Sequence, residues 1–335
     1  MFKCLNVYMF STIILFILGF ILLIKGADIM IDGSSSVAKK YGLSSFFIGL
    51  TIIAFGTSAP ELVISALASL KGSSGIALGN IIGSNITNTL LILGVSAIIA
   101  PLIIKRSTVN KEIPLSLLAV LAVGFLVNDV LIDKADFNIL SRIDGLILIL
   151  LFIIFIFYTF GITREKENFL EKTVGNLKQE AIKEYSNSKA TLMIVIGLVG
   201  LVIGGKWIVD GAISFASAFG ISEILIGSTI VAVGTSLPEL AASAMAAKKG
   251  NTDMAVGNVV GSNIFNLLWV LGISSTIRQI SYNSILNVDI IILFSITILL
   301  LFLIYIGKKN ILAKWEGIVL LCLYAGYVVF LVLRG

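Results

Sequence analysis

The chain has 335 residues, of which 58% are hydrophobic and only 13% are charged, with a formal net charge of +5. Charged residues make up about a quarter of an ordinary soluble domain, so the composition excludes a soluble globular enzyme, a disordered chain and a disulfide scaffold. The sequence contains no histidine, which excludes histidine-based catalysis, proton switches and metal ligands.

Long apolar runs predict an all-α, polytopic membrane protein. A helix that crosses the hydrocarbon core needs about 20 apolar residues, and the sequence has ten such runs. A charged stretch separates the first five from the last five, so we expect a five-helix unit over 1–162, a cytoplasmic linker over 163–189 and a second five-helix unit over 190–335. The predicted spans are 9–30, 44–70, 75–101, 113–128, 139–161, 190–210, 222–247, 252–276, 286–306 and 312–333.

The placement of Lys and Arg predicts the orientation in the membrane, because cytoplasmic loops carry an excess of these residues. With the N-terminus outside, the inside loops hold most of them, including the pairs Lys39–Lys40, Lys248–Lys249 and Lys308–Lys309. We therefore expect a multi-pass protein of the cell membrane with both the N- and the C-terminus outside. The net positive charge is interpreted as loop charge and not as a nucleic-acid surface.

An internal repeat predicts the architecture. Gly42–Gly94 aligns with Gly220–Gly272 at an offset of 178 residues without a gap, and 29 of the 53 positions are identical. Each unit has five predicted spans, an odd number, so the second unit must enter the membrane from the opposite face. The sequence thus predicts ten helices arranged as two inverted five-helix repeats, an arrangement typical of secondary transporters and also found in channels.

Each repeat carries a Gly-Thr-Ser-x-Pro-Glu motif inside an apolar run, at Gly56–Glu61 and at Gly234–Glu239. Gly and Pro four residues apart interrupt a helix. An interruption at membrane depth frees backbone carbonyls, which must then be satisfied, and a cation can do this. In the first repeat we expect these carbonyls to be those of Ala54, Phe55 and Gly56.

Glu61 and Glu239 are the carboxylates that the sequence places deep in a span. A charge there costs at least about 2.5–3.5 kcal/mol. Because the two Glu residues occupy equivalent places in an inverted repeat, we expect them to meet at a common site near the middle of the membrane. The alternative is a protonated Glu that is hydrogen-bonded to a neighbouring helix.

Polar side chains at helical spacing accompany the two carboxylates. Thr57, Glu61 and Ser65 share one helix face, as do Asn80, Ser84 and Asn88 on the next span, and both stripes recur in the second repeat. Hydrogen bonding between helices is the alternative interpretation of the Asn stripe. Taken together the oxygens form a hard ligand set, which suits calcium and sodium better than soft metals.

The paired sequences GTSAPE…GNIIGSNITN and GTSLPE…GNVVGSNIFN resemble the two alpha-repeats of the calcium:cation antiporter superfamily, most closely its prokaryotic sodium/calcium exchanger-type members. The resemblance covers nearly the whole chain. It implies an inverted-repeat bundle that alternates access by sliding its first and sixth helices. It also implies metal ligands at Glu61, Glu239, Thr57, Ser58, Thr235, Ser236, Ser84, Ser262, Asn88 and Asn266, and at the carbonyls of Ala54 and Ala232.

The sequence departs from this family at Asn266, where sodium/calcium exchangers of this type carry Asp. Two carboxylates give the site a charge of −2, which one calcium or two monovalent cations would neutralise. We therefore expect near-electroneutral exchange of calcium for sodium, with protons as the alternative coupling ion. We expect no cofactor and no obligatory protein partner besides the lipid bilayer.

Two other classes of protein remain open. A cation channel is the second hypothesis, because carboxylates also line channels, and a need for an opposing ion distinguishes an exchanger from it. An intramembrane enzyme is the third. It is disfavoured because Ser58 and Ser236 have no histidine, and no intramembrane Lys at a convincing spacing, to activate them.

Overall fold

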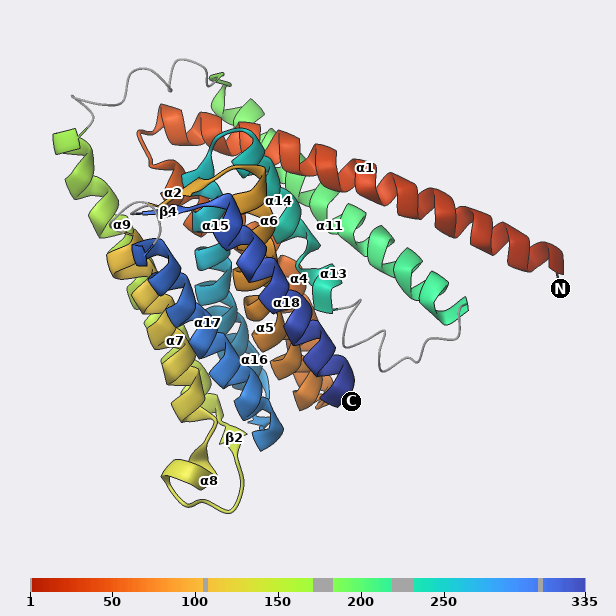
Figure 1. The fold of residues 1–335 in the computed structure, drawn as a ribbon, viewed down its shortest axis with the longest axis vertical. Coiled ribbons are helices and arrows are strands. Elements are labelled where there is room, and N and C mark those ends of the chain that lie inside the picture. The colour runs from red at the N-terminus through yellow and green to blue at the C-terminus, as the bar shows by residue number, and fades with distance from the viewer. Residues whose placement is uncertain (1, 105–107, 171–182, 219–231, 307–309, 335) are drawn as a thin grey trace.

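The computed structural model describes residues 2–104, 108–170, 183–218, 232–306 and 310–334, which are almost entirely helical (Figure 1). The first half comprises α1 (Phe2–Lys40), α2 (Ser45–Ile48), η1 (Gly49–Ile53), α3 (Ala54–Thr57), α4 (Ala59–Lys71), α5 (Ser74–Thr87), η2 (Asn88–Ile92), α6 (Leu93–Ile99), β1 (Leu102–Ile103), η3 (Thr108–Glu112), α7 (Ile113–Leu126), α8 (Asp129–Ile132), β2 (Ile139–Leu140) and α9 (Arg142–Leu170). The second half comprises α11 (Asn187–Ala218), α13 (Ala232–Thr235), α14 (Leu237–Lys248), α15 (Thr252–Ile264), η5 (Phe265–Val270), α16 (Leu271–Ile277), β3 (Ile280–Ser281), η6 (Ser284–Leu286), α17 (Asn287–Ile306), β4 (Ile311–Leu312) and α18 (Lys314–Arg334).

Most of the predicted spans correspond to long apolar helices. Seven helices in the described ranges are long and apolar enough to cross a membrane, or eight if the bent pair Ser45–Thr57 and Ala59–Lys71 forms one span. The predicted span 113–128 corresponds to α7, which has only 14 residues. The predicted span 222–247 and the linker 163–189 lie partly outside the described residues, so the count of ten spans stays a prediction.

Two continuous helices, each with a π-helical stretch in its middle, form the centre of the bundle. One runs from Ser74 to Ile99 through α5, η2 and α6, and the other runs from Thr252 to Ile277 through α15, η5 and α16. In their apolar windows 78% and 89% of the residues are buried, against 22–44% in the other spans. These two helices are therefore enclosed by protein, which is where a membrane protein tolerates polar side chains.

The short strands connect the two halves of the chain. β1 pairs antiparallel with β4, and β2 pairs antiparallel with β3, so each pair takes one strand from each half. In Figure 1, β4 lies near the top of the bundle and β2 lies at its lower end, beside α8. The halves are thus joined at both ends of the molecule.

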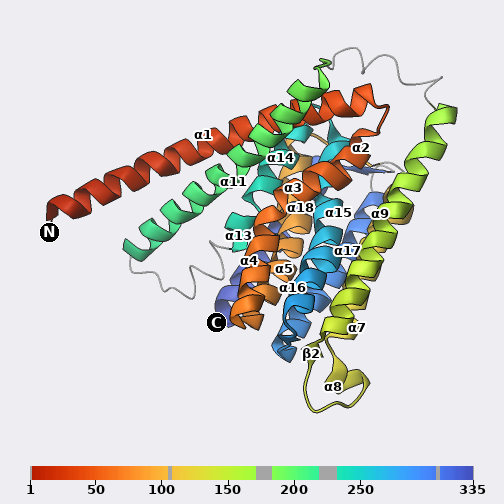
Figure 2. The same cartoon turned by 180° about the vertical axis from the view of Figure 1, so that it is seen from behind.

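Helices α1 and α11 lie side by side and extend away from the rest of the bundle (Figures 1 and 2). A Cβ atom on Gly26 would lie 2.8 Å from the carbonyl oxygen of Gly197, and one on Gly197 would lie 2.7 Å from that of Gly26. Gly19 and Gly204 repeat this reciprocal contact, with corresponding distances of 2.9 and 2.7 Å. Only glycine permits such close approach of two helix backbones. We refer to these four residues as the glycine seam.

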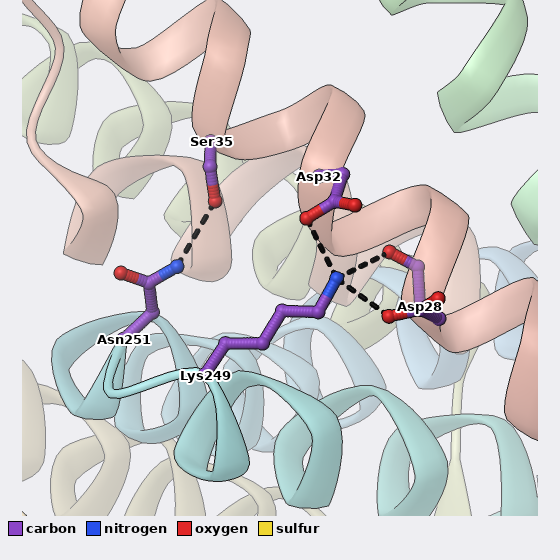
Figure 3. Close-up of polar contacts among 5 residues, drawn as sticks. All are labelled: Asp28, Asp32, Ser35, Lys249 and Asn251. Atoms are coloured by element: carbon purple, nitrogen blue, oxygen red, sulfur yellow. Dashed lines mark hydrogen bonds and ion pairs between the residues drawn. The ribbon is translucent and has the colours of Figure 1, made fainter. Parts of the chain in front are cut away.

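Helix α1 continues to Lys40, ten residues beyond the predicted end of the first span at residue 30. Figure 3 shows that the polar end of α1 contacts the segment that follows α14. The Nζ atom of Lys249 lies 2.7 Å from Asp28 Oδ1 and 2.6 Å from Asp32 Oδ1, and Asn251 donates a hydrogen bond to Ser35 at 3.0 Å. These partners are more than 200 residues away in sequence, so local hydrophobicity could not indicate them.

We expect Lys249→Met to loosen the attachment of α1. The substitution leaves two carboxylates one helical turn apart without their shared cation, which should lower the stability by about 1 kcal/mol. Thermal unfolding in detergent measures the effect. Lys248→Met is the matched control, because Lys248 is exposed and forms no ion pair with the described residues. An equal loss of stability in both variants would contradict this role of Lys249.

Candidate cation site

The two motif prolines restart a helix directly before each buried glutamate. The chain turns at Ser58 between α3 and α4, which are bent by 45°, and at Ser236 between α13 and α14. Pro lies in the first turn of both α4 and α14, where its missing N–H costs nothing. The interruption predicted from Gly and Pro is therefore confirmed, and it places Glu61 and Glu239 in the first turn of a helix, both fully buried.

The backbone at the turn differs from the expectation in one respect. The carbonyl of Ala54 is not free, because it accepts a hydrogen bond from the N–H of Ser58 at 3.0 Å. The hydroxyl of Thr57 also lies 3.4 Å from this carbonyl oxygen. Helix α3 continues to Thr57, so the N–H of Ser58 still forms the helical hydrogen bond to the carbonyl four residues earlier. In the second half, Ala232 is the first residue of α13, and the N–H of Ser236 bonds instead to the carbonyl of Val233 at 3.2 Å.

Hydroxyl groups of each turn contact the other half of the chain. Ser58 donates a hydrogen bond to Oε1 of Glu239 at 2.8 Å. Thr57 donates to Oδ1 of Asn258 at 3.3 Å, and Thr235 donates in the same way to Oδ1 of Asn80, also at 3.3 Å. The two motifs, far apart in sequence, therefore meet in one polar region at the centre of the bundle.

Asn80 and Asn258 hold this region together through hydrogen bonds between helices. The Nδ2 atom of Asn80 bonds to Ser65 at 3.0 Å and to the carbonyl of Glu61 at 3.4 Å. Asn258 makes the equivalent bonds to Ser243 at 2.9 Å and to the carbonyl of Glu239 at 3.3 Å. Both amides are thus satisfied at the oxygen and the nitrogen, which supports the structural interpretation of these two members of the Asn stripe.

Six buried oxygens in the same region have no hydrogen-bond partner among the described residues. Buried polar atoms are normally paired, and leaving one unpaired costs about 1–3 kcal/mol. Each of them is an oxygen of the kind that can ligate a hard cation. The six atoms are Oε2 of Glu61 and Glu239, Oγ of Ser236 and Ser262, and Oδ1 of Asn88 and Asn266.

The two halves of the region are similar but not identical. Ser84 donates to Glu61 Oε1 at 3.5 Å, whereas the hydroxyl of its counterpart Ser262 forms no hydrogen bond within the described part of the chain. Ser58 donates a hydrogen bond to Glu239, whereas the hydroxyl of its counterpart Ser236 has no hydrogen-bond partner in the ranges that the structure describes. The described residues contain no group of three or more Asp, Glu, Cys or His side chains that could hold a metal ion. A cation here would therefore be held by two carboxylates and several neutral oxygens.

Three further side chains of this region do not stand out from the sequence. Asn85, Asn263 and Thr89 lie beside Asn88 and Asn266, and their hydrogen bonds connect the two central helices. The predicted polar stripe follows the helix face that carries Ser84 and Asn88, and Asn85 lies beside this face and not on it. The same residue type recurs at Asn263, at the 178-residue offset, and this repetition is the sequence signal that points to Asn85.

Comparison with known proteins identifies the family. Residues 11–161 and 189–333 match the sodium/calcium exchanger protein family. The chain belongs to this family. Among its relatives, the sodium/calcium exchanger MaX1 of Methanosarcina acetivorans is 33% identical over 346 residues, covering 95% of this chain and 97% of MaX1. The Ca(2+)/H(+) antiporter ChaA of Bacillus subtilis is 29% identical over 223 residues, covering 64% of this chain and 63% of ChaA.

Solved structures agree with this assignment. The structure of the sodium-calcium exchanger NCX_Mj, soaked with sodium and calcium, is similar to this exchanger-family chain with a TM-score of 0.79 and 35% sequence identity. The similarity covers 95% of this chain and 98% of NCX_Mj. The protein is therefore a multi-pass membrane protein of a family of cation exchangers, which are transporters and not enzymes.

Proposed function

We propose that this member of the exchanger family is a secondary active antiporter that exchanges calcium for sodium across the cell membrane by alternating access. The observation that carries the proposal is a set of six buried oxygens in the polar region at the centre of the bundle, which have no hydrogen-bond partner among the described residues. Two of these oxygens belong to Glu61 and Glu239, whose burial without a countercharge would otherwise be costly. A transported cation supplies that charge.

The proposed ligand set combines both carboxylates with hydroxyl, amide and carbonyl oxygens from the two halves. Calcium accepts six to eight such oxygens in flexible geometry, and sodium is also a hard cation. Hydroxyls already bound to a carboxylate, such as that of Ser58, still have a lone pair for the ion. The carbonyl of Ala54 accepts one hydrogen bond from Ser58, and its second lone pair can face the ion. The proposed ligands are Glu61, Glu239, Thr57, Ser58, Thr235, Ser236, Ser84, Ser262, Asn88, Asn266 and the carbonyls of Ala54 and Ala232.

The architecture that we propose is ten transmembrane helices in two inverted repeats, over 1–162 and 190–335, with a cytoplasmic linker over 163–189 and both termini outside. The strand pairs support it. At the repeat offset of 178 residues, β1 corresponds to β3, and these two strands lie in different sheets. Each pairs with a strand from the opposite half, as expected when two repeats are related by a two-fold axis.

We expect the exchange to be near-electroneutral. One calcium ion, two sodium ions or two protons each balance the two carboxylates, and a surplus charge in a desolvated site is unfavourable. Radiolabelled calcium uptake into proteoliposomes with an outward sodium gradient should therefore proceed with little dependence on an imposed membrane potential. A potential that strongly drives calcium flux would contradict this charge balance.

The same assay distinguishes the alternatives. Uptake driven by an outward proton gradient, and not by sodium, would make the protein a calcium/proton antiporter. The similarity to ChaA and the presence of two carboxylates able to bind protons favour this as the second candidate. Calcium flux that needs no opposing ion would instead indicate a channel.

A further inference from the structure

We propose that Asn85, Asn263 and Thr89 are positioning residues, which orient the amides of Asn88 and Asn266 so that their oxygens face the transported cation. The inference rests on the proposed function, because it concerns the same site. It assigns a role to three side chains that are not themselves among the proposed ligands. The argument follows from which atoms can only donate and which can only accept a hydrogen bond.

The orientation of Asn266 is set by a backbone carbonyl. The carbonyl of Asn263 can only accept, so the group of Asn85 that lies 3.2 Å from it must be the Nδ2 donor. The other end of the Asn85 amide is therefore Oδ1, and it faces Asn266. Asn266 must then present its own Nδ2, which lies 3.1 Å from Asn85 Oδ1. The Oδ1 of Asn266 is left buried, without a hydrogen-bond partner among the residues that the structure describes.

The orientation of Asn88 is set by a threonine hydroxyl. Thr89 donates its proton to the carbonyl of Asn85 at 2.9 Å, so toward Asn263 it can only accept. Asn263 therefore turns its Nδ2 toward Thr89, at 2.9 Å, and its Oδ1 toward Asn88. Asn88 in turn donates from its Nδ2 to that oxygen at 3.1 Å, and its own Oδ1 is left buried with no hydrogen-bond partner in the described ranges.

These contacts also favour an amide over a carboxylate at both ligand positions. An ionised Asp at 266 would place an oxygen against Oδ1 of Asn85, where Asn266 now donates. The same conflict would arise at 88 against Oδ1 of Asn263. Two acceptors at this separation repel each other in a buried region. The positioning residues thus provide a physical reason why Asn stands at 266, and they keep the ligand charge at two carboxylates.

Thr89 offers the sharpest test because it is buried and its hydroxyl acts two hydrogen bonds away from the ion ligand. Thr89→Val keeps the shape of the side chain and removes the hydroxyl, so the Asn263 amide can turn and release Asn88. Partners that orient metal ligands typically change affinity by about 10- to 100-fold. We expect Thr89→Val to raise half-saturating calcium about tenfold while the maximal rate stays within about twofold.

Thr89→Ser is the conservative control, since it retains a hydroxyl that can donate to Asn85 and accept from Asn263. It should restore the wild-type half-saturation. The ratio of half-saturating strontium to half-saturating calcium gives a second readout, because a merely structural defect would change both alike. If Thr89→Val is not obtained as a monodisperse protein, Thr89→Ala removes the same hydroxyl with less crowding, and the same rise is expected.

The outcomes separate the two proposals. Suppose that the wild-type protein exchanges calcium, but Thr89→Val has the same half-saturating calcium concentration, or Thr89→Ser is as defective as Thr89→Val. Either result would overturn the positioning role and leave the proposed function intact. Wild-type protein without saturable calcium-dependent exchange would overturn the proposed function and the positioning role together.

Discussion

Glu61→Gln and Glu239→Gln should each abolish calcium exchange. Either substitution leaves one carboxylate for a divalent cation in a fully buried region. Removing one partner of a buried charge interaction costs about 3–5 kcal/mol, which corresponds to about 100- to 4,000-fold in affinity. Radiolabelled calcium uptake by the purified variants in proteoliposomes measures the loss. Near-normal exchange in either variant would show that the proposed ligand assignment is wrong.

Glu316→Gln is the matched control for this experiment. Glu316 is also a fully buried glutamate, but it lies in the first turn of α18 and accepts a hydrogen bond from the backbone N–H of Ala313. A Gln side chain retains an oxygen that can accept this bond. We therefore expect Glu316→Gln to keep its calcium uptake, which distinguishes loss of a site carboxylate from loss of a buried glutamate in general.

Gly197→Val should separate α1 from α11 and prevent normal folding. A Cβ atom at this position would lie 2.6 Å from the Cβ of Met30 and 2.7 Å from the carbonyl oxygen of Gly26. Overpacking costs about 1–3 kcal/mol where side chains can adjust. Here one neighbour is backbone, so the helices themselves must move, and we expect little monodisperse protein and no measurable exchange.

Gly326→Val provides the comparison, because Gly326 lies within α18 and a Cβ atom there would meet nothing within 4 Å. Size-exclusion chromatography and thermal unfolding of both variants measure the difference. If Gly197→Val yields as much folded protein as Gly326→Val, the glycine seam is not required for the packing of the two helices.

Local sequence chemistry predicted the helix interruptions well. Gly56 and Pro60 act within one turn of themselves, so their effect can be inferred without tertiary information. Burial of Glu61 and Glu239 also followed from the apolar runs around them. Their role as cation ligands remains a prediction, which the uptake experiment tests.

Features that depend on distant contacts could not be predicted in this way. The polar end of α1 remains helical because Lys249 and Asn251 lie beside it, and these contacts are invisible in a local pattern. The orientation of Asn266 depends on Asn85, which belongs to the other half of the chain. Such pairings require knowledge of how the central helices cross.

The glycine seam and the strand pairs have a consequence for the origin of the protein. Each seam contact takes one glycine from each half, and each two-stranded sheet takes one strand from each half. Neither half can complete its own packing. In the inverted-repeat architecture that we propose, an ancestral gene that encoded a single repeat would therefore have needed two copies of its product, inserted in opposite directions, to form this structure. Duplication and fusion would then have made that pairing permanent and allowed the copies to diverge, as at Thr89 and Leu267.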